Sequence, residues 1–257
     1  MTGAAGHLDA VGALMRRALN ELLRVPGAAI PGVLAPSLFM LGLTGVFGEL
    51  TELQGFDTDS FLSFILPVSL VQGATFAGAA TGVNLARDIE IGWFDRLLAA
   101  PVPRPALLAG IVLSASLRSL LPITGVLVLG LALGANWPGI DGLLVAVGLG
   151  FAFASVAASW TVGLALRFKT QAAAPLMQAS MFVAVLFTTS YAPQEVLTGW
   201  LATVARYNPV TRVVEGVRQG FVGEVTWSET WPALAVLVVL LALMVAFALR
   251  GLRHAGD

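Results

Sequence analysis

Long apolar stretches without a charged residue recur along the whole chain, and they restrict its possible folds more than any other feature. Five of them run for at least 20 residues, and a sixth is interrupted only by Arg118. A helix needs roughly 20 residues to cross a hydrocarbon core about 30 Å thick. The sequence therefore predicts six membrane spans, at about residues 25–48, 60–86, 107–134, 142–166, 170–192 and 230–249.

The composition fits a chain that lies in lipid. Among its 257 residues, 57% are apolar and 11% are charged, whereas about 25% of an ordinary soluble domain is charged. So few charged side chains cannot cover a water-exposed surface, and lipid must contact most of the exterior. We expect a single all-α integral membrane domain over residues 1–257, and the composition excludes a soluble enzyme.

Several kinds of chemistry lack their residues in this sequence. The chain has no cysteine, and its two histidines, His7 and His254, lie near opposite ends, so we expect no metal site. Its only lysine, Lys169, follows Phe168 instead of closing a glycine-rich loop, which removes the familiar ATP-binding loop. The net charge of −1 argues against nucleic-acid binding. We expect no catalytic residue and no cofactor in this chain.

The basic residues predict the orientation, because short loops rich in Arg and Lys stay in the cytoplasm. Basic residues precede the first span, follow the second and fourth spans, and end the chain, whereas residues 49–59 carry four acids and no base. Both termini are therefore predicted to be cytoplasmic. The basic residues assigned to that side are Arg16, Arg17, Arg24, Arg87, Arg96, Arg104, Arg167, Lys169, Arg250 and Arg253.

Three segments differ from plain spans. Residues 7–24 have the spacing of an amphipathic helix, which we expect in the cytoplasmic interface as an anchor or as a partner contact. Residues 88–104 interleave charges with aromatic and leucine side chains, which suits a short cytoplasmic helix that binds a soluble protein, or a solvated connector. Residues 193–225 predict two short extracellular re-entrant helices, with Asn208 as the cap of the second helix and Pro209 at its first position.

Two further features concern the interior of the spans. Arg118 would be costly in mid-membrane, which makes it a functional candidate. The interpretation we favour is that the helix after Arg104 first follows the interface and that the true span begins near Arg118. Two glycine pairs, Gly78 with Gly82 and Gly130 with Gly134, are each spaced four residues apart, which predicts close approaches between helices.

Two motifs resemble those of a known family, the type-two ABC-exporter permeases, and especially its daunorubicin-resistance branch. Residues 90–104, EIGWFDRLLAAPVPR, are similar to that family's E-x-G-T-x-D-R-L-x-x-x-P-x-S-R loop, with Trp93 and Pro103 as departures. Residues 198–218 are similar to its P-x-W-L … N-P-V-T-x-x-x-(D/E)-x-x-R pattern, with Thr198 in place of the proline. The predicted span number and orientation also agree with the family.

The resemblance implies a permease subunit that works with two ATP-binding subunits, which would hold the ATP and Mg. It also implies a second permease subunit, for which we favour another copy of this chain. Residues 7–24 and the segment after the second span would dock on the ATPases. The candidate coupling residues are Arg87, Asp88, Glu90, Gly92, Trp93, Phe94, Asp95, Arg96, Leu97, Pro101 and Arg104.

The resemblance further implies an export path lined mainly by the first, second and fifth spans. The candidate path residues, for each of which ordinary helix packing is the alternative, are Phe39, Phe64, Gln72, Phe76, Met177, Gln178, Met181 and Phe182. The candidate residues of the extracellular helices are Trp200, Asn208, Pro209, Glu215 and Arg218. We expect export of a hydrophobic or amphipathic compound, such as a drug, antibiotic or lipid, across a bacterial cell membrane. The alternatives are an exporter of lipid, glycolipid or polysaccharide, and a membrane subunit that recruits partners without transporting anything.

Overall fold

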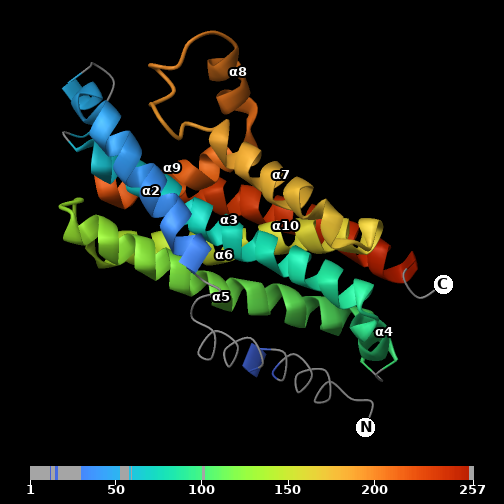
Figure 1. The fold of residues 1–257 in the computed structure, drawn as a ribbon. Coiled ribbons are helices and arrows are strands. Elements are labelled where there is room, and N and C mark those ends of the chain that lie inside the picture. The colour runs from blue at the N-terminus through green and yellow to red at the C-terminus, as the bar shows by residue number, and fades with distance from the viewer. Residues whose placement is uncertain are drawn as a thin grey trace.

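The computed structural model describes residues 30–52, 58, 60–99 and 102–254, together with residues 12, 15 and 16. These residues form helices and connecting turns, without strands (Figure 1). Of the predicted helix over residues 7–24, only positions 12, 15 and 16 are among the described residues. The candidate residue Pro101 lies outside them. The helices are α2 (Ile30–Phe47), α3 (Phe61–Glu90), α4 (Trp93–Leu98), α5 (Arg104–Ala132), α6 (Gly139–Phe168), α7 (Ala174–Leu186), α8 (Gly199–Tyr207), α9 (Pro209–Val222) and α10 (Trp227–His254), with short 3-10 helices η2 (Gly48–Glu52) and η3 (Gln171–Ala173).

Five of the described helices are long and apolar enough to cross a membrane: α2, α3, α5, α6 and α10. At 1.5 Å per residue, the 29 or 30 residues of α3, α5 and α6 give rods of about 45 Å, longer than a hydrocarbon core. Each of these three helices is therefore longer than a straight crossing requires. The chain is an all-helical integral membrane protein.

The fifth predicted span, residues 170–192, does not form one long helix. The chain makes the short η3 and then the 13-residue α7, which ends at Leu186. The hydroxyls of Thr188 and Ser190 both donate to the carbonyl of Val185, at 2.7 Å each. The Val185 carbonyl therefore accepts two side-chain hydroxyls where α7 ends inside an uncharged stretch.

Helix α3 lies at the centre of the bundle and packs against α2, α5, α6, α7 and α9 (Figure 1). Of the two glycine pairs that the sequence singles out, Gly130 faces Leu66 of α3, whereas Gly134 lies beyond the end of α5 and an added Cβ there meets nothing within 4 Å. The close approach of α3 to α6 depends on the other pair. A Cβ atom at Gly78 would lie 2.6 Å from the Cβ of Ala157, and one at Gly82 would lie 2.5 Å from the Cβ of Thr161. The predicted glycine contact is therefore confirmed, because a larger residue at either position would separate the two helices.

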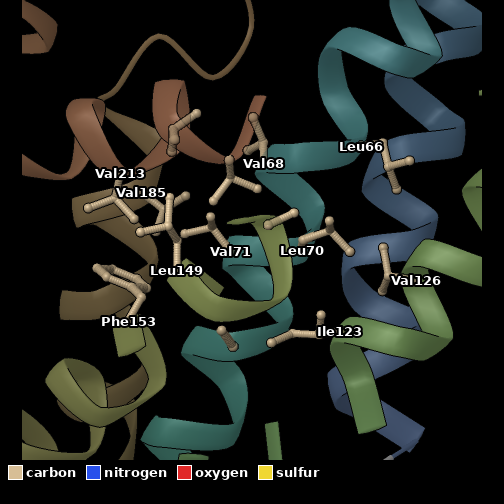
Figure 2. Close-up of a cluster of buried hydrophobic side chains, with 14 of the residues drawn as sticks. Leu66, Val68, Leu70, Val71, Ile123, Val126, Leu149, Phe153, Val185 and Val213 are labelled. Carbon is tan, nitrogen blue, oxygen red and sulfur yellow. The ribbon is translucent and has the colours of Figure 1, made fainter. Parts of the chain in front are cut away.

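The core has two parts, one toward each end of the bundle. The first contains side chains from α3, α5, α6, α7 and α9 that meet between the helices (Figure 2). The second contains Phe94 of α4 together with residues such as Leu107, Leu166, Met177 and Leu252. We call the side of the bundle that holds α4 the α4 end, and the opposite side, which holds η2, α8 and α9, the α8 end.

The interpretation that a span begins near Arg118 is wrong. Helix α5 runs unbroken from Arg104 to Ala132, with Arg118 at its midpoint and Pro122 inside it. The guanidinium Nη2 of Arg118 lies 3.5 Å from the hydroxyl oxygen of Thr81 on α3. Thr81 precedes Arg87 by six residues, about 9 Å along α3, so the guanidinium of Arg118 lies beside a polar side chain of a neighbouring helix.

Candidate functional site

The segment after the second span is divided between two helices, and the single cytoplasmic helix expected over residues 88–104 is not formed. Arg87, Asp88 and Glu90 belong to the last turn of α3. The amide of Gly92 donates to the carbonyl of Ile89 at 3.0 Å, and Gly92 has a positive φ of 70°. Glycine adopts this left-handed conformation without a steric penalty, so it suits the point where the chain turns from α3 into α4.

Helix α4 has one apolar and one charged side. Phe94 is only 1% exposed, within the core cluster at this end, and Leu97 packs against the same cluster. Asp95 and Arg96 are exposed. The helix is therefore held to the bundle by its apolar side and presents its charges away from it, an arrangement that can bind a soluble partner.

The Glu90 carboxylate bonds to its own chain. Its Oε1 accepts a hydrogen bond of 2.6 Å from the Thr170 hydroxyl and one of 3.1 Å from the Gln171 backbone amide. We call these two bonds the Glu90 clasp. It joins the end of α3 to the start of η3 and α7, and it could not be foreseen from the sequence, because the partners are 80 residues apart.

The α4 end is predominantly basic. Arg104, the first residue of α5, donates from Nη1 to the carbonyl of Arg253 on α10 at 3.3 Å, which ties the two helix ends together. Asp88, Glu90 and Asp95 are the acids of this end in the described part of the chain. The basic side chains there are Arg87, Arg96, Arg104, Arg167, Lys169, Arg250 and Arg253.

The candidate path residues fall into two groups. Phe64, Gln72 and Met177 are at most 3% exposed, so they lie inside the bundle in this conformation. Phe39 on α2 and Phe182 on α7 face each other with ring centroids 5.8 Å apart. The remaining members of this second group are Phe76 and Met181, which are half-buried, and Gln178, which is exposed.

Gln72 is the polar member of the buried group. Its side-chain Oε1 has no hydrogen-bond partner among the described residues. A buried amide oxygen left this way costs free energy, so it marks a polar point inside the bundle.

At the α8 end, Asn208 joins three helices. Its Oδ1 accepts from the amide of Val210 at 3.0 Å, which caps α9 with Pro209 in its first turn, as the sequence predicts. Its Nδ2 donates to the carbonyls of Ala184 and Phe187 at 2.8 Å each, so the same side chain also closes the end of α7. The first predicted helix of this region is α8, which begins at Gly199.

Arg218 on α9 is buried, with 6% of its surface exposed. Its Nε donates to the Phe64 carbonyl at 3.1 Å, and its Nη2 donates to the Thr189 carbonyl at 2.7 Å. Its guanidinium carbon also lies 3.7 Å from the centre of the Phe64 ring, within the range of a cation–π contact. Arg218 thus fastens α9 both to α3 and to the chain that follows α7.

The other candidates of this end lie nearer the surface. Glu215 pairs with Arg212 at 3.1 Å. Burial raises the pKa of the Glu215 carboxyl, and the charges of Arg212 and Arg218 partly oppose that rise. Trp200 on α8 is 67% exposed and touches the edge of the Phe187 ring, with centroids 5.6 Å apart.

The described residues contain no group of three His, Cys, Asp or Glu side chains that could hold a metal ion.

One hydrogen bond between α6 and α7 is not predictable from the sequence. The indole Nε1 of Trp160 on α6 donates to the hydroxyl of Ser180 on α7 at 2.9 Å. Neither residue stands in a motif, so only the packing of α6 beside α7 reveals the pair.

Comparison with known proteins gives consistent relatives. The family model for ABC-2 type transporters matches residues 9–222. The daunorubicin resistance ABC transporter permease protein DrrB1 of Streptomyces coeruleorubidus is 27% identical over 243 residues, which cover 93% of this chain and 84% of that protein. A putative transport permease, ycf38, of Cyanophora paradoxa is 26% identical over 80% of this chain and 71% of that protein. The probable doxorubicin resistance ABC transporter permease protein DrrC of Mycobacterium tuberculosis is 26% identical, with 80% and 72% covered.

Proposed function

The chain belongs to the ABC-2 type transporter family, and we propose that it is the permease subunit of an ATP-driven exporter for hydrophobic or amphipathic compounds. Its relatives are permease subunits of ABC transporters, so it is a transport subunit without ATPase activity of its own. The single observation that carries the proposal is the charged face of α4, because a permease without a nucleotide site needs a surface on which an ATPase can act.

The substrate class is supported by the relatives' names and by the exposed side chains of two helices. Two relatives are named for resistance to daunorubicin or doxorubicin. Phe39 on α2 and Gln178 on α7 are exposed, and the same two helices also expose Leu34 and Val183. An apolar surface with a few amides suits an amphipathic compound, but it would serve a lipid or glycolipid equally well.

We place the α4 end in the cytoplasm. We also count α7 as a crossing in addition to the five long helices, which makes six crossings and puts both termini on the cytoplasmic side. The excess of basic residues at the α4 end supports this orientation. Exposed aromatic side chains gather at the α8 end, as is typical of a membrane–water interface. They are Trp137, Trp200, Tyr207, Trp227 and Trp231.

The proposed assembly contains two ATP-binding subunits, which carry ATP and Mg, and a second permease subunit, with a homodimer favoured. The charged face of α4, with Asp95 and Arg96, would dock on the ATPase, together with residues 7–24. Closure of the ATPases on nucleotide would push on α4 and open the path between the two permeases toward the outside.

Reversal of one charge on α4 tests the proposal. Asp95→Arg should abolish ATP-dependent export in proteoliposomes that contain this chain and its ATPase, while insertion into the membrane stays normal. Glu224→Arg, the same change at an exposed position of the α8 end, is the matched control and should export normally. Unchanged export by Asp95→Arg would remove the coupling role of α4, and binding of partners without any export by the wild type would favour a recruiting subunit.

A further inference from the structure

We propose that α7 transmits displacement from the ATPase side to the α8 end, and that the Glu90 clasp is the contact through which this displacement reaches α7. This inference rests on the proposed function and extends it. It assigns Glu90 a positioning role inside the permease, where family resemblance alone gives it a place on the docking surface.

The clasp lies next to the segment on which an ATPase would push. Glu90 is the last residue of α3, and only Ile91 and Gly92 separate it from α4. Its carboxylate accepts two hydrogen bonds from the residues that begin η3, and bonds to an ionised acceptor are stronger than neutral ones. The Thr170 hydroxyl also accepts from the amide of Ala172 at 3.2 Å. A displacement of α4 therefore reaches the start of α7 through short, directed contacts.

The α4 end also contains a buried apolar cluster to which both α4 and α7 contribute. Phe94 of α4 and Met177 of α7 belong to one buried cluster, at 1% and 0% exposure. Close-packed side chains transmit displacement because little free space remains between them. The clasp thus fixes the start of α7, and the cluster supports its first turn.

The far end of α7 is fastened to the helices of the α8 end. Asn208 donates to the carbonyls of Ala184 and Phe187, and Arg218 donates to the carbonyl of Thr189. Both donors belong to the segment that joins and forms α9. A helix of 13 residues is about 20 Å long, so a shift at Thr170 is passed along α7 to α9.

Along its length α7 has an open side. Leu176 and Val183 are 49% and 43% exposed, and in the middle of the helix Ser180 accepts the hydrogen bond from Trp160 of α6. Helix α7 also carries Met181 and Phe182 of the candidate path. Helix α7 is thus fastened at both ends and bonded once to α6 at its middle, and its open side leaves room for Met181 and Phe182 to move when it shifts.

The first test compares three variants in proteoliposomes that contain this chain and its ATPase. Glu90→Ala removes both bonds of the clasp and Thr170→Val removes the shorter one, whereas Glu90→Gln keeps a side-chain oxygen that can accept both bonds. We expect Glu90→Ala and Thr170→Val to lower transport per ATP hydrolysed by about tenfold, the factor that corresponds to one hydrogen bond to a charged group. ATPase binding and ATP hydrolysis should stay near wild type in both, and Glu90→Gln should restore transport.

The matched control is Glu224→Ala, which removes an exposed carboxylate at the other end of the bundle and should leave transport unchanged. Normal coupling in Glu90→Ala would overturn the inference, and so would a loss of ATPase binding in that variant, since Glu90 would then belong to the docking surface. If the wild type itself shows no ATP-dependent transport, the proposed function fails and the inference falls with it.

The second test uses the absence of cysteine from the sequence. In the double variant Glu90→Cys with Thr170→Cys, the two introduced thiols are the only ones in this chain. We expect this variant to be uncoupled when reduced and to regain transport when a short bis-methanethiosulfonate linker joins the two thiols. Glu90→Cys alone, treated with the same linker, should stay uncoupled. Transport that is blocked by the linker would overturn the inference, because the Glu90 clasp would then have to open during the transport cycle.

Discussion

Arg218 shows how much of the α8 end depends on one side chain. It is buried and gives hydrogen bonds to two backbone carbonyls from different parts of the chain. We expect Arg218→Met to destabilise the folded protein by about 3 kcal/mol, because both carbonyls lose a charged donor. Arg218→Lys should cost less, since an ammonium can satisfy one of them but has no fork for both.

Thermal unfolding of the purified protein in mild detergent measures this effect. Arg212→Met is the matched control, because Arg212 lies on the same helix, with 56% of its side chain exposed. It should change the free energy of unfolding by less than about 1 kcal/mol. Equal effects of the two substitutions would contradict the fastening role of Arg218.

At the residue scale, local signals were predictable and distant partners were not. The sequence predicts Asn208 as a cap, because an Asn directly before a proline that opens an apolar helix is a strong local signal. The structure confirms that cap. Its second role, on the carbonyls of α7, was not predictable, because those residues lie more than 20 positions away. The same holds for Glu90 and Thr170.

At the scale of helices, the contact between α3 and α6 gives a sharp expectation. At Gly82 a Cβ atom would lie 2.6 Å from the backbone carbonyl carbon of Thr161, and backbone cannot move aside cheaply. Gly82→Ala should therefore destabilise the protein by about 1–3 kcal/mol. Thermal unfolding and the yield of folded protein would measure this.

The matched control is Gly45→Ala in α2, where an added Cβ meets nothing within 4 Å in the described structure. Alanine forms helices better than glycine by up to about 1 kcal/mol, so this change should be neutral or stabilising. If Gly82→Ala proved as harmless as Gly45→Ala, the close contact between α3 and α6 would be wrong.

The length of each uncharged stretch of sequence predicts where the long helices lie, but it cannot predict where each helix ends. It predicts a span at residues 170–192, whereas α7 ends at Leu186, where side chains of distant and following residues bind the carbonyls of its last turn. The charge of Arg118 suggests that the span begins near this residue, whereas α5 continues through Arg118 and Pro122. Charge marks contact with water only where no neighbouring helix offers a polar partner, and such partners depend on packing.

At the scale of the whole molecule, the proposed orientation predicts which positions a membrane-impermeant thiol reagent can reach. The chain lacks cysteine, so a single introduced thiol reports on one place. Glu224→Cys, at the α8 end, should be labelled in intact cells. Arg253→Cys, at the α4 end, should be labelled only after the membrane is made permeable, and the opposite pattern would reverse the orientation.

The central claim is that this chain is the permease of an ATP-driven exporter, and one measurement tests it most directly. The chain is purified from its native membranes in mild detergent, its associated subunits are identified, and ATP hydrolysis by the eluate is assayed with hydrophobic compounds added. We expect an ATP-binding subunit in stoichiometric amount, with a hydrolysis rate that responds to some of these compounds. A chain that purifies alone, with no ATP hydrolysis, would contradict the claim.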